Sequence, residues 1–319
     1  MTKLCRLLIV ALALSSMSAS ALAAGPVVVA TSLQALYSLT SFLSKGTGIQ
    51  VESVPKALPG MGQLQRTFVR QNAAIGEQLA KADAVVTISS VWPDDPLYRE
   101  ARSRNIRVVQ IDAARSLGKT ASSVMLVAQP SSNVPWRRID PASGDSPYVW
   151  FSPSNAIRMA EIVAADLARL APDDAGTIEA NLKTFSQELR ALRAEFEAKF
   201  LAAQNPEVFI LTDHFAYLTG EFGIFIDGAL LEDDVRWSAE DYEGLTKLLR
   251  DRDIKTVLHH WQPDEKIVDA VQKGGAKLVL LDDGEHSDGS AAAPPDSPSV
   301  VGVLRTNLDL LNRAFATQQ

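Results

Sequence analysis

One long segment without glycine constrains the fold of this chain more than any other feature. From Thr177 to Ala203 the sequence holds no glycine, and Pro172-Asp173 before it and Asn205-Pro206 after it are start and stop signals for a helix. Six apolar residues recur in it at alternating spacings of four and three: Ile178, Leu182, Phe185, Leu189, Leu192 and Phe196. This spacing predicts one amphipathic helix. At about 1.5 Å per residue it would be roughly 40 Å long, enough to join two domains rigidly.

Apolar runs rich in valine and isoleucine alternate with helix-period segments on both sides of this helix. The runs before it are Val27–Ser32, Asp83–Ser89 and Ile106–Asp112, and those after it are Glu207–Asp213, Ile254–His260 and Ala276–Asp283. Continuous apolar runs are typical of strands buried on both faces of a parallel sheet. We therefore predict an α/β protein of two doubly wound lobes, over residues 24–172 and 206–319, joined by a long rigid linking helix over residues 173–205.

The first 23 residues have the pattern of a secretory signal peptide. Lys3 and Arg6 precede the apolar run Leu7–Leu14, and small residues flank Leu22. The run is too short to span a bilayer, which takes about 20 residues. We expect cleavage after Ala23 and an exported chain. The only cysteine, Cys5, would leave with the peptide, so the mature chain would have neither a disulfide nor a thiolate metal site.

The charge and the absence of catalytic motifs exclude several classes of function. The formal net charge is −7, and loss of the basic residues of the signal peptide would make the mature chain more acidic still, which argues against nucleic acid or an anionic membrane as a partner. The sequence has no glycine-flanked serine nucleophile and no cofactor fingerprint. We therefore do not expect an enzyme.

Six segments of the mature chain together suggest a family: VVVATSLQALYSLTSFL, ADAVV, SPYVWFSPSNAIRMAEIVAADLARLAPDD, IEANLKTFSQELRALRAEF, TDHFAYLTGEFGI and GGAKLVLLD. In them the chain resembles, over almost the whole mature sequence, the periplasmic solute-binding proteins of metal ABC importers, the zinc and manganese binders called ZnuA-like or TroA-like. The resemblance implies a protein that binds a metal ion in the cleft between two lobes and delivers it to an ABC permease. It also implies a periplasmic location, and we expect a monomer.

The resemblance implies four metal ligands, of which this chain keeps two. His214 and Asp282 match a histidine or glutamate and a carboxylate of the second lobe. The histidine expected in the segment DSPYVWFSP is replaced by Tyr148, and Arg66 stands near the position of the histidine expected in the first lobe. Arginine cannot bind a cation, because its guanidinium group only donates hydrogen bonds. Tyrosine binds metals as phenolate, which favours a hard ion such as ferric iron.

Two adjacent histidines offer a replacement. His259 and His260 end a predicted strand, and ligands collect at the carboxyl ends of strands in open α/β sheets. One of the two is expected to face the cleft, and the set Tyr148, His214, His260 and Asp282 would form a mixed nitrogen and oxygen site. Each has a structural alternative: the histidines as hydrogen-bonded interior or strand-end groups, and Asp282 as a turn residue.

The expected cargo is a transition metal ion, zinc or iron first and manganese as a further possibility. The alternative hypothesis keeps the fold and changes the cargo to a chelated metal of the siderophore type, with the bare-metal site partly lost. Arg66, Trp136, Arg137 and His259 would then contact the anionic complex in the cleft, by stacking or by charge. For Trp136 and Arg137 the competing interpretation is a solvated loop with one aromatic side chain tucked down.

Overall fold

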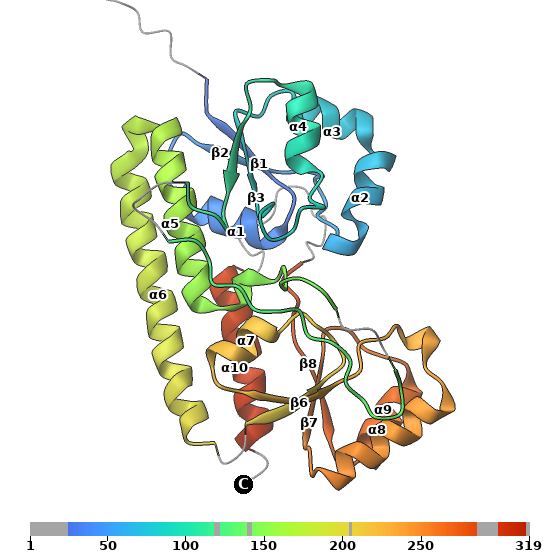
Figure 1. The fold of residues 1–319 in the computed structure, drawn as a ribbon. Helices are drawn as coiled ribbons and strands as arrows, with labels where there is room; N and C mark the ends of the chain where they lie inside the picture. The colour runs from blue at the N-terminus through green and yellow to red at the C-terminus, as the bar shows by residue number, and fades with distance from the viewer. Residues whose placement is uncertain (1–24, 118–121, 139–141, 204–205, 286–298, 317–319) are drawn as a thin grey trace, which may run out of the picture.

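The computed structural model describes residues 25–117, 122–138, 142–203, 206–285 and 299–316. The predicted signal peptide lies outside the described residues. Two lobes lie one above the other, and the long helix α6 (Ala175–Leu201) runs along one side of both, with α5 (Pro153–Leu170) beside its upper part (Figure 1). Among the described residues, none of the helices is both long and apolar enough to cross a membrane.

The first lobe is built on a four-stranded parallel sheet. Its strands are β1 (Val28–Thr31), β2 (Gln50–Ser53), β3 (Ala84–Thr87) and β4 (Val109–Asp112), in the order β2-β1-β3-β4. Its helices are α1 (Gln34–Leu43), α2 (Met61–Arg70), α3 (Asn72–Leu79) and α4 (Leu97–Arg104). The order in which strands join the sheet reverses between β1 and β3, because β2 lies on one side of β1 and β3 on the other. Ligand crevices form at such a switch point in doubly wound sheets.

The second lobe repeats this arrangement. Its strands are β5 (Glu207–Ile210), β6 (Phe225–Ala229), β7 (Thr256–His259) and β8 (Lys277–Leu280), all parallel and in the order β6-β5-β7-β8. The helices are α7 (Ala216–Glu221), α8 (Ala239–Asp251), α9 (Glu265–Lys273) and α10 (Val300–Ala316), with a 3-10 turn η3 (Asp234–Arg236). The prediction of two α/β lobes with parallel sheets is confirmed, and in this lobe the reversal lies between β5 and β7.

Helices α5 (Pro153–Leu170) and α6 (Ala175–Leu201) join the lobes, with 3-10 turns η1 (Val149–Phe151) and η2 (Pro172–Asp174) before each. Helix α5 begins with proline at its first position, and the Ser152 hydroxyl accepts a hydrogen bond from the Asn155 backbone N–H as its N-cap. In α6, five of the six stripe residues are buried, and Leu182 packs against the core from the edge. The long linking helix predicted from the sequence is therefore confirmed.

One segment between β4 and η1, residues 122–138, crosses from the first lobe to the second (Figure 1, green). Asn133 pairs with Ala229 of β6 through two hydrogen bonds, from its own N–H to the Ala229 carbonyl and from the Ala229 N–H to its side-chain oxygen. Val134 is buried in the core of the second lobe, and Trp136 packs against it. Part of the sequence range that we assigned to the first lobe thus packs on the second, and this crossing segment forms another connection between the lobes.

Trp136 lies directly on Gly244 of α8, which gives a prediction. A Cβ atom at Gly244 would lie 2.4 Å from the Trp136 ring, so the Gly244→Ala variant must displace the ring. We expect a loss of about 1–3 kcal/mol of unfolding free energy in urea denaturation, although alanine normally stabilises a helix by about 1 kcal/mol over glycine. The matched control is Gly62→Ala in α2, where nothing lies within 4 Å of the new atom. Equal stabilisation in both variants would contradict the packing described here.

Candidate metal centre

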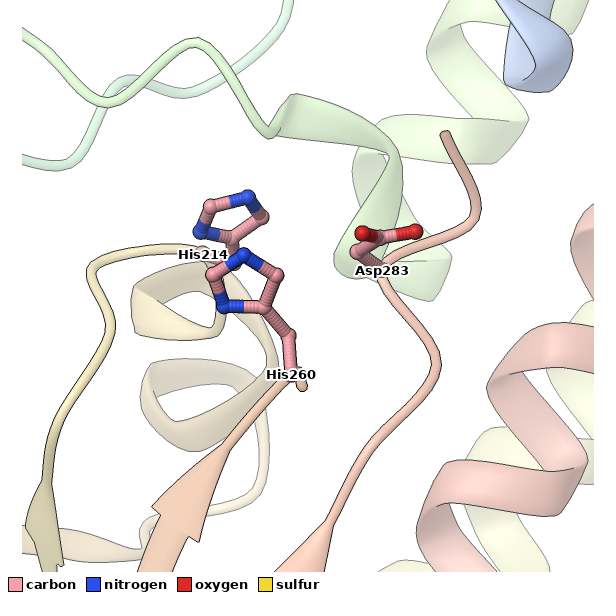
Figure 2. Close-up of side chains that lie close together, drawn as sticks. All are labelled: His214, His260 and Asp283. Carbon is pink, nitrogen blue, oxygen red and sulfur yellow. The ribbon is translucent and has the colours of Figure 1, made fainter. Parts of the chain in front are cut away.

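Three residues that can bind a metal converge where strands of the second lobe end. His214 follows β5, His260 follows β7 directly, and Asp283 follows β8. Because β5 and β7 flank the point where the chain reverses across the sheet, the two imidazoles lie at the crevice that this topology creates. One ligand atom from each of the three residues lies within 4.8 Å of the other two (Figure 2).

The spacing of these atoms is compatible with a shared ion. Two ligand atoms on a tetrahedral zinc ion lie about 3.3 Å apart, since each is about 2.0–2.1 Å from the metal. The His214 and His260 rings are stacked, with centroids 3.9 Å apart and planes at 26°. Nitrogen lone pairs lie in the ring plane, so the two rings must tilt toward a shared ion. The site therefore needs small side-chain rotations on loading.

Tyr148 extends this stack on the other side of His214. Its ring lies 3.9 Å from the His214 ring at an angle of 22°, and it meets Trp150 edge to face. Burial, together with the nearby carboxylates of Glu285, Asp213 and Asp283, raises the pKa of Tyr148 above its ordinary value. In the absence of metal, the phenol is therefore held in its protonated form.

The ring of His214 is oriented through its Nδ1 atom. The hydroxyl oxygen of Thr212 lies 2.7 Å from Nδ1, and an Asp213 carboxylate oxygen lies 3.1 Å from it. The other Asp213 oxygen accepts a hydrogen bond of 2.7 Å from the side-chain amide of Gln129 in the crossing segment. Burial acts to raise the pKa of Asp213, but the hydrogen bonds from His214 and Gln129 outweigh it, and the pKa is lowered.

The two adjacent aspartates after β8 have different places. Asp283 is 8% exposed and belongs to the cluster, whereas Asp282 is exposed. The Asp282 carboxylate accepts a hydrogen bond from the Gly284 N–H, and its backbone N–H and carbonyl both pair with the Asn307 side chain of α10. Of the predicted set, the structure thus brings His214, His260 and Tyr148 together. Asp283, not Asp282, is the aspartate that lies with the two histidines.

The first lobe contributes no imidazole, because all four histidines of the chain lie at or beyond residue 214. The first lobe meets the loop after β8 through the Met61 backbone N–H at the start of α2, which donates to the Glu285 carboxylate over 3.2 Å. Arg66 lies on the exposed side of the same helix. The first lobe also holds a buried carboxyl group, that of Asp95 before α4. The hydroxyl of Ser32, between β1 and α1, donates to it, and burial raises the pKa of Asp95 to about 6.

His259 differs from its neighbour. It is 2% exposed, its Nδ1 accepts the His260 backbone N–H at 2.9 Å, and its ring lies 4.1 Å from that of Trp261. Burial lowers the pKa of His259 to about 4. His259 is therefore a neutral interior group that fixes the backbone of His260.

Trp136 and Arg137 are held away from this cluster by acidic residues of the second lobe. The Trp136 indole N–H donates to Asp241 over 3.1 Å, and the Arg137 guanidinium pairs with Asp241 and with Glu232 at 3.1 Å. Asp241 also completes the capping box of α8 with Ser238. The two side chains therefore anchor the crossing segment on the second lobe. Their contacts fit a loop with its aromatic side chain tucked down better than they fit an anion clamp.

Sequence reasoning missed Asp283, Asp213 and Gln129. The run Leu281-Asp282-Asp283 offers two carboxylates one residue apart, and sequence alone does not decide which turns inward. An aspartate directly before a candidate histidine ligand is a usable signal for Asp213, because metal-binding histidines commonly pair their second nitrogen with a carboxylate. Nothing in the sequence pattern points to Gln129, which is 84 residues from its partner.

Fold and site together define a two-lobed α/β protein with a candidate metal centre at the strand ends of its second lobe. Residues 29–314 match the family described as zinc-uptake complex component A, periplasmic. The chain belongs to this family, which confirms the resemblance found in the sequence.

Individual relatives are distant. The manganese-binding lipoprotein MntA of Bacillus subtilis is 24% identical over 175 residues, 53% of this chain and 57% of MntA. The high-affinity zinc uptake system protein ZnuA of Paracoccus denitrificans is 29% identical over 82 residues, 26% of this chain and 25% of that protein. The matches thus span about half or less of these relatives. The solved structure of FpvC from Pseudomonas aeruginosa in complex with Mn²⁺ has a TM-score of 0.68 at 21% identity, covering 92% of this chain and all of FpvC, which shows a shared fold.

Proposed function

We propose that this protein is a periplasmic solute-binding protein that captures a divalent transition metal ion and delivers it to an ABC permease. The observation that carries the proposal is the convergence of His214, His260 and Asp283 at the switch point of the second sheet. Family membership supports it, as do the metal-binding names of MntA and ZnuA.

The donor set favours zinc among the candidate ions. Two imidazoles and one carboxylate with an open fourth position are a common zinc arrangement, whereas manganese prefers more oxygen ligands. Ferric iron would draw on Tyr148 as phenolate, whereas in the metal-free protein burial and the surrounding carboxylates keep that phenol protonated, so loading with ferric iron would have to displace the proton. In this proposal Tyr148 is the stacked wall of the site that limits rotation of His214.

A bare ion is favoured over a chelated one. Two of the side chains that would clamp an anionic complex are engaged elsewhere, because Asp241 and Glu232 neutralise Arg137 and Asp241 also holds Trp136. The carboxylates of Asp213, Asp283 and Glu285 near the stack make the site attractive to a cation and repulsive to an anion.

The proposal includes export with removal of residues 1–23, a permease as partner and no covalent chemistry. The stiff helix α6 and the crossing segment both tie the lobes together. We therefore expect small lobe movements on loading rather than wide hinge closure.

Titration of the metal-free protein tests the function. Calorimetry should give one zinc ion per chain with a dissociation constant below about 1 μM, with weaker binding of manganese. The melting temperature should rise with zinc, because an ion at a hundred times its dissociation constant adds about 2.7 kcal/mol when it binds only the folded state. Ferric iron should give no visible phenolate charge-transfer band. Flat heats and an unchanged melting temperature with every one of these ions would refute the proposal.

A further inference from the structure

A chain of hydrogen bonds leads from the crossing segment to one imidazole of the candidate centre. Gln129 donates from its side-chain nitrogen to one Asp213 oxygen over 2.7 Å, and the other Asp213 oxygen lies 3.1 Å from His214 Nδ1. Thr212 Oγ1 lies 2.7 Å from the same nitrogen. Asp213 and Gln129 are not ligands in the cluster, so their contribution to metal binding would be made through His214.

The carboxylate decides which ring nitrogen carries the proton. An ionised carboxylate only accepts hydrogen bonds, so its contact with Nδ1 requires an N–H there. The Thr212 hydroxyl can accept from that N–H or donate to a bare nitrogen, and it fits either tautomer. With Asp213 in place, Nδ1 is protonated and Nε2 keeps a free lone pair. Without it, the Thr212 hydroxyl can donate to Nδ1, which moves the ring proton to Nε2 and blocks that atom.

Gln129 is itself held in a fixed place by the crossing segment. Its backbone N–H donates to the Gly144 carbonyl, and the neighbouring Ala128 forms an antiparallel bridge with Asp145. The Val127 N–H donates to the Tyr217 hydroxyl of α7, which in turn donates to the Ser146 carbonyl. Helix α7 follows His214 directly in the chain. The segment is thus tied to α7 through Tyr217, which lies shortly after Asp213 in the chain.

We propose that Asp213 and Gln129 are positioning residues that hold His214 in the Nδ1–H tautomer and present its Nε2 atom to the metal ion. This inference rests on the proposed function of the site. Outer partners of metal-binding histidines fix the ring orientation and raise its basicity, and their loss commonly costs 10- to 100-fold in metal affinity. Gln129 acts through Asp213, by keeping the carboxylate turned toward the ring.

The test combines ring NMR with zinc titration of full-length variants. Two-bond ¹H–¹⁵N spectra of the metal-free wild type should show His214 as the Nδ1–H tautomer. In Asp213→Ala the signal should move to the Nε2–H form, and zinc affinity should fall about 10- to 100-fold. Gln129→Ala should give a smaller fall with mixed tautomers. The double variant should bind no more weakly than Asp213→Ala, because both residues act along one path.

Matched controls separate positioning from stability. Gln50→Ala removes another amide that donates to a carboxylate, that of Glu52, and Asp227→Ala removes an aspartate of the same lobe that pairs with Arg252. Both should leave the tautomer and the zinc affinity unchanged even where they lower the melting temperature.

Two results would overturn the inference while leaving the proposed function intact. One is an Nε2–H tautomer of His214 in the wild-type protein. The other is unchanged zinc affinity in Asp213→Ala and Gln129→Ala while the wild type binds zinc. Failure of the wild type to bind zinc would instead contradict the proposed function, and the tautomer measurement would still decide whether Asp213 orients the ring.

Discussion

Replacing His214 or His260 with alanine will weaken zinc binding about 100- to 1000-fold. Structural zinc sites with four ligands provide about 10–16 kcal/mol of apparent binding free energy, or roughly 3 kcal/mol per ligand. Each 1.4 kcal/mol is about tenfold in affinity, which gives the expected range. The two rings stack at 3.9 Å and belong to the same three-residue cluster, so each substitution should have a similar effect. Competition titration against a chelator of known affinity measures it.

His259 supplies the control for this prediction. It is the neighbour of His260 in the chain but is buried, neutral and bonded to the His260 backbone. We expect His259→Gln to lower the melting temperature and to change zinc affinity less than tenfold. If His259→Gln abolishes zinc binding in a folded protein while His260→Ala does not, the two histidines have been assigned the wrong roles.

The second large effect separates two adjacent aspartates. Asp283→Asn should weaken zinc binding at least 100-fold, because it removes the only carboxylate of the cluster and its negative charge. Asp282→Asn should change affinity less than threefold, since an amide oxygen can still accept the Gly284 N–H and the Asn307 contacts use the backbone. Calorimetry on the two variants measures the difference.

The Asp282 and Asp283 variants are matched in chemistry and differ by one position, so general effects of charge on the protein largely cancel. Equal losses in both would show that the loop as a whole matters and not one ligand. A larger loss in Asp282→Asn would return the ligand role to the residue that the family resemblance indicated.

The helical part of the fold was predictable because its signal is long. The stripe of α6 extends over 19 residues, from Ile178 to Phe196, and the structure buries that stripe. The strands β2 and β6 were missed for physical reasons. Both are edge strands of four or five residues. QVES has a single apolar residue, and in FIDGA an aspartate and a glycine interrupt the apolar run. An edge strand needs little apolar surface, so its sequence resembles a loop.

The candidate site was predictable only as far as strand ends reveal it. His214 and His260 follow apolar runs that are recognisable as parallel strands, and the rule that ligands gather at carboxyl ends brings them together. The choice between Asp282 and Asp283 depends on how the chain turns after Leu280, where Gly284 adopts a positive φ of 62°. Such a turn is set by tertiary contacts, here those of Asn307.

The roles of the crossing segment could not be predicted for a similar reason. Residues 122–138 contain no periodic pattern, and Gln129 and Trp136 find their partners 84 and 105 positions later in the chain. The sequence offered two interpretations of Trp136, an anion clamp or a solvated loop with one aromatic side chain tucked down, and it could not name the surface on which the ring packs. The indole packs on Gly244 of α8, where any larger side chain would collide with the ring.

Anomalous diffraction at the zinc absorption edge tests the central claim most directly. In crystals of the zinc-loaded protein, we predict one strong anomalous peak at about 2.0–2.2 Å from an imidazole nitrogen of His214, one of His260 and a carboxylate oxygen of Asp283. The His214 nitrogen should be Nε2. A single strong peak bound by other residues, or no peak in protein that calorimetry shows to be loaded, would contradict the account.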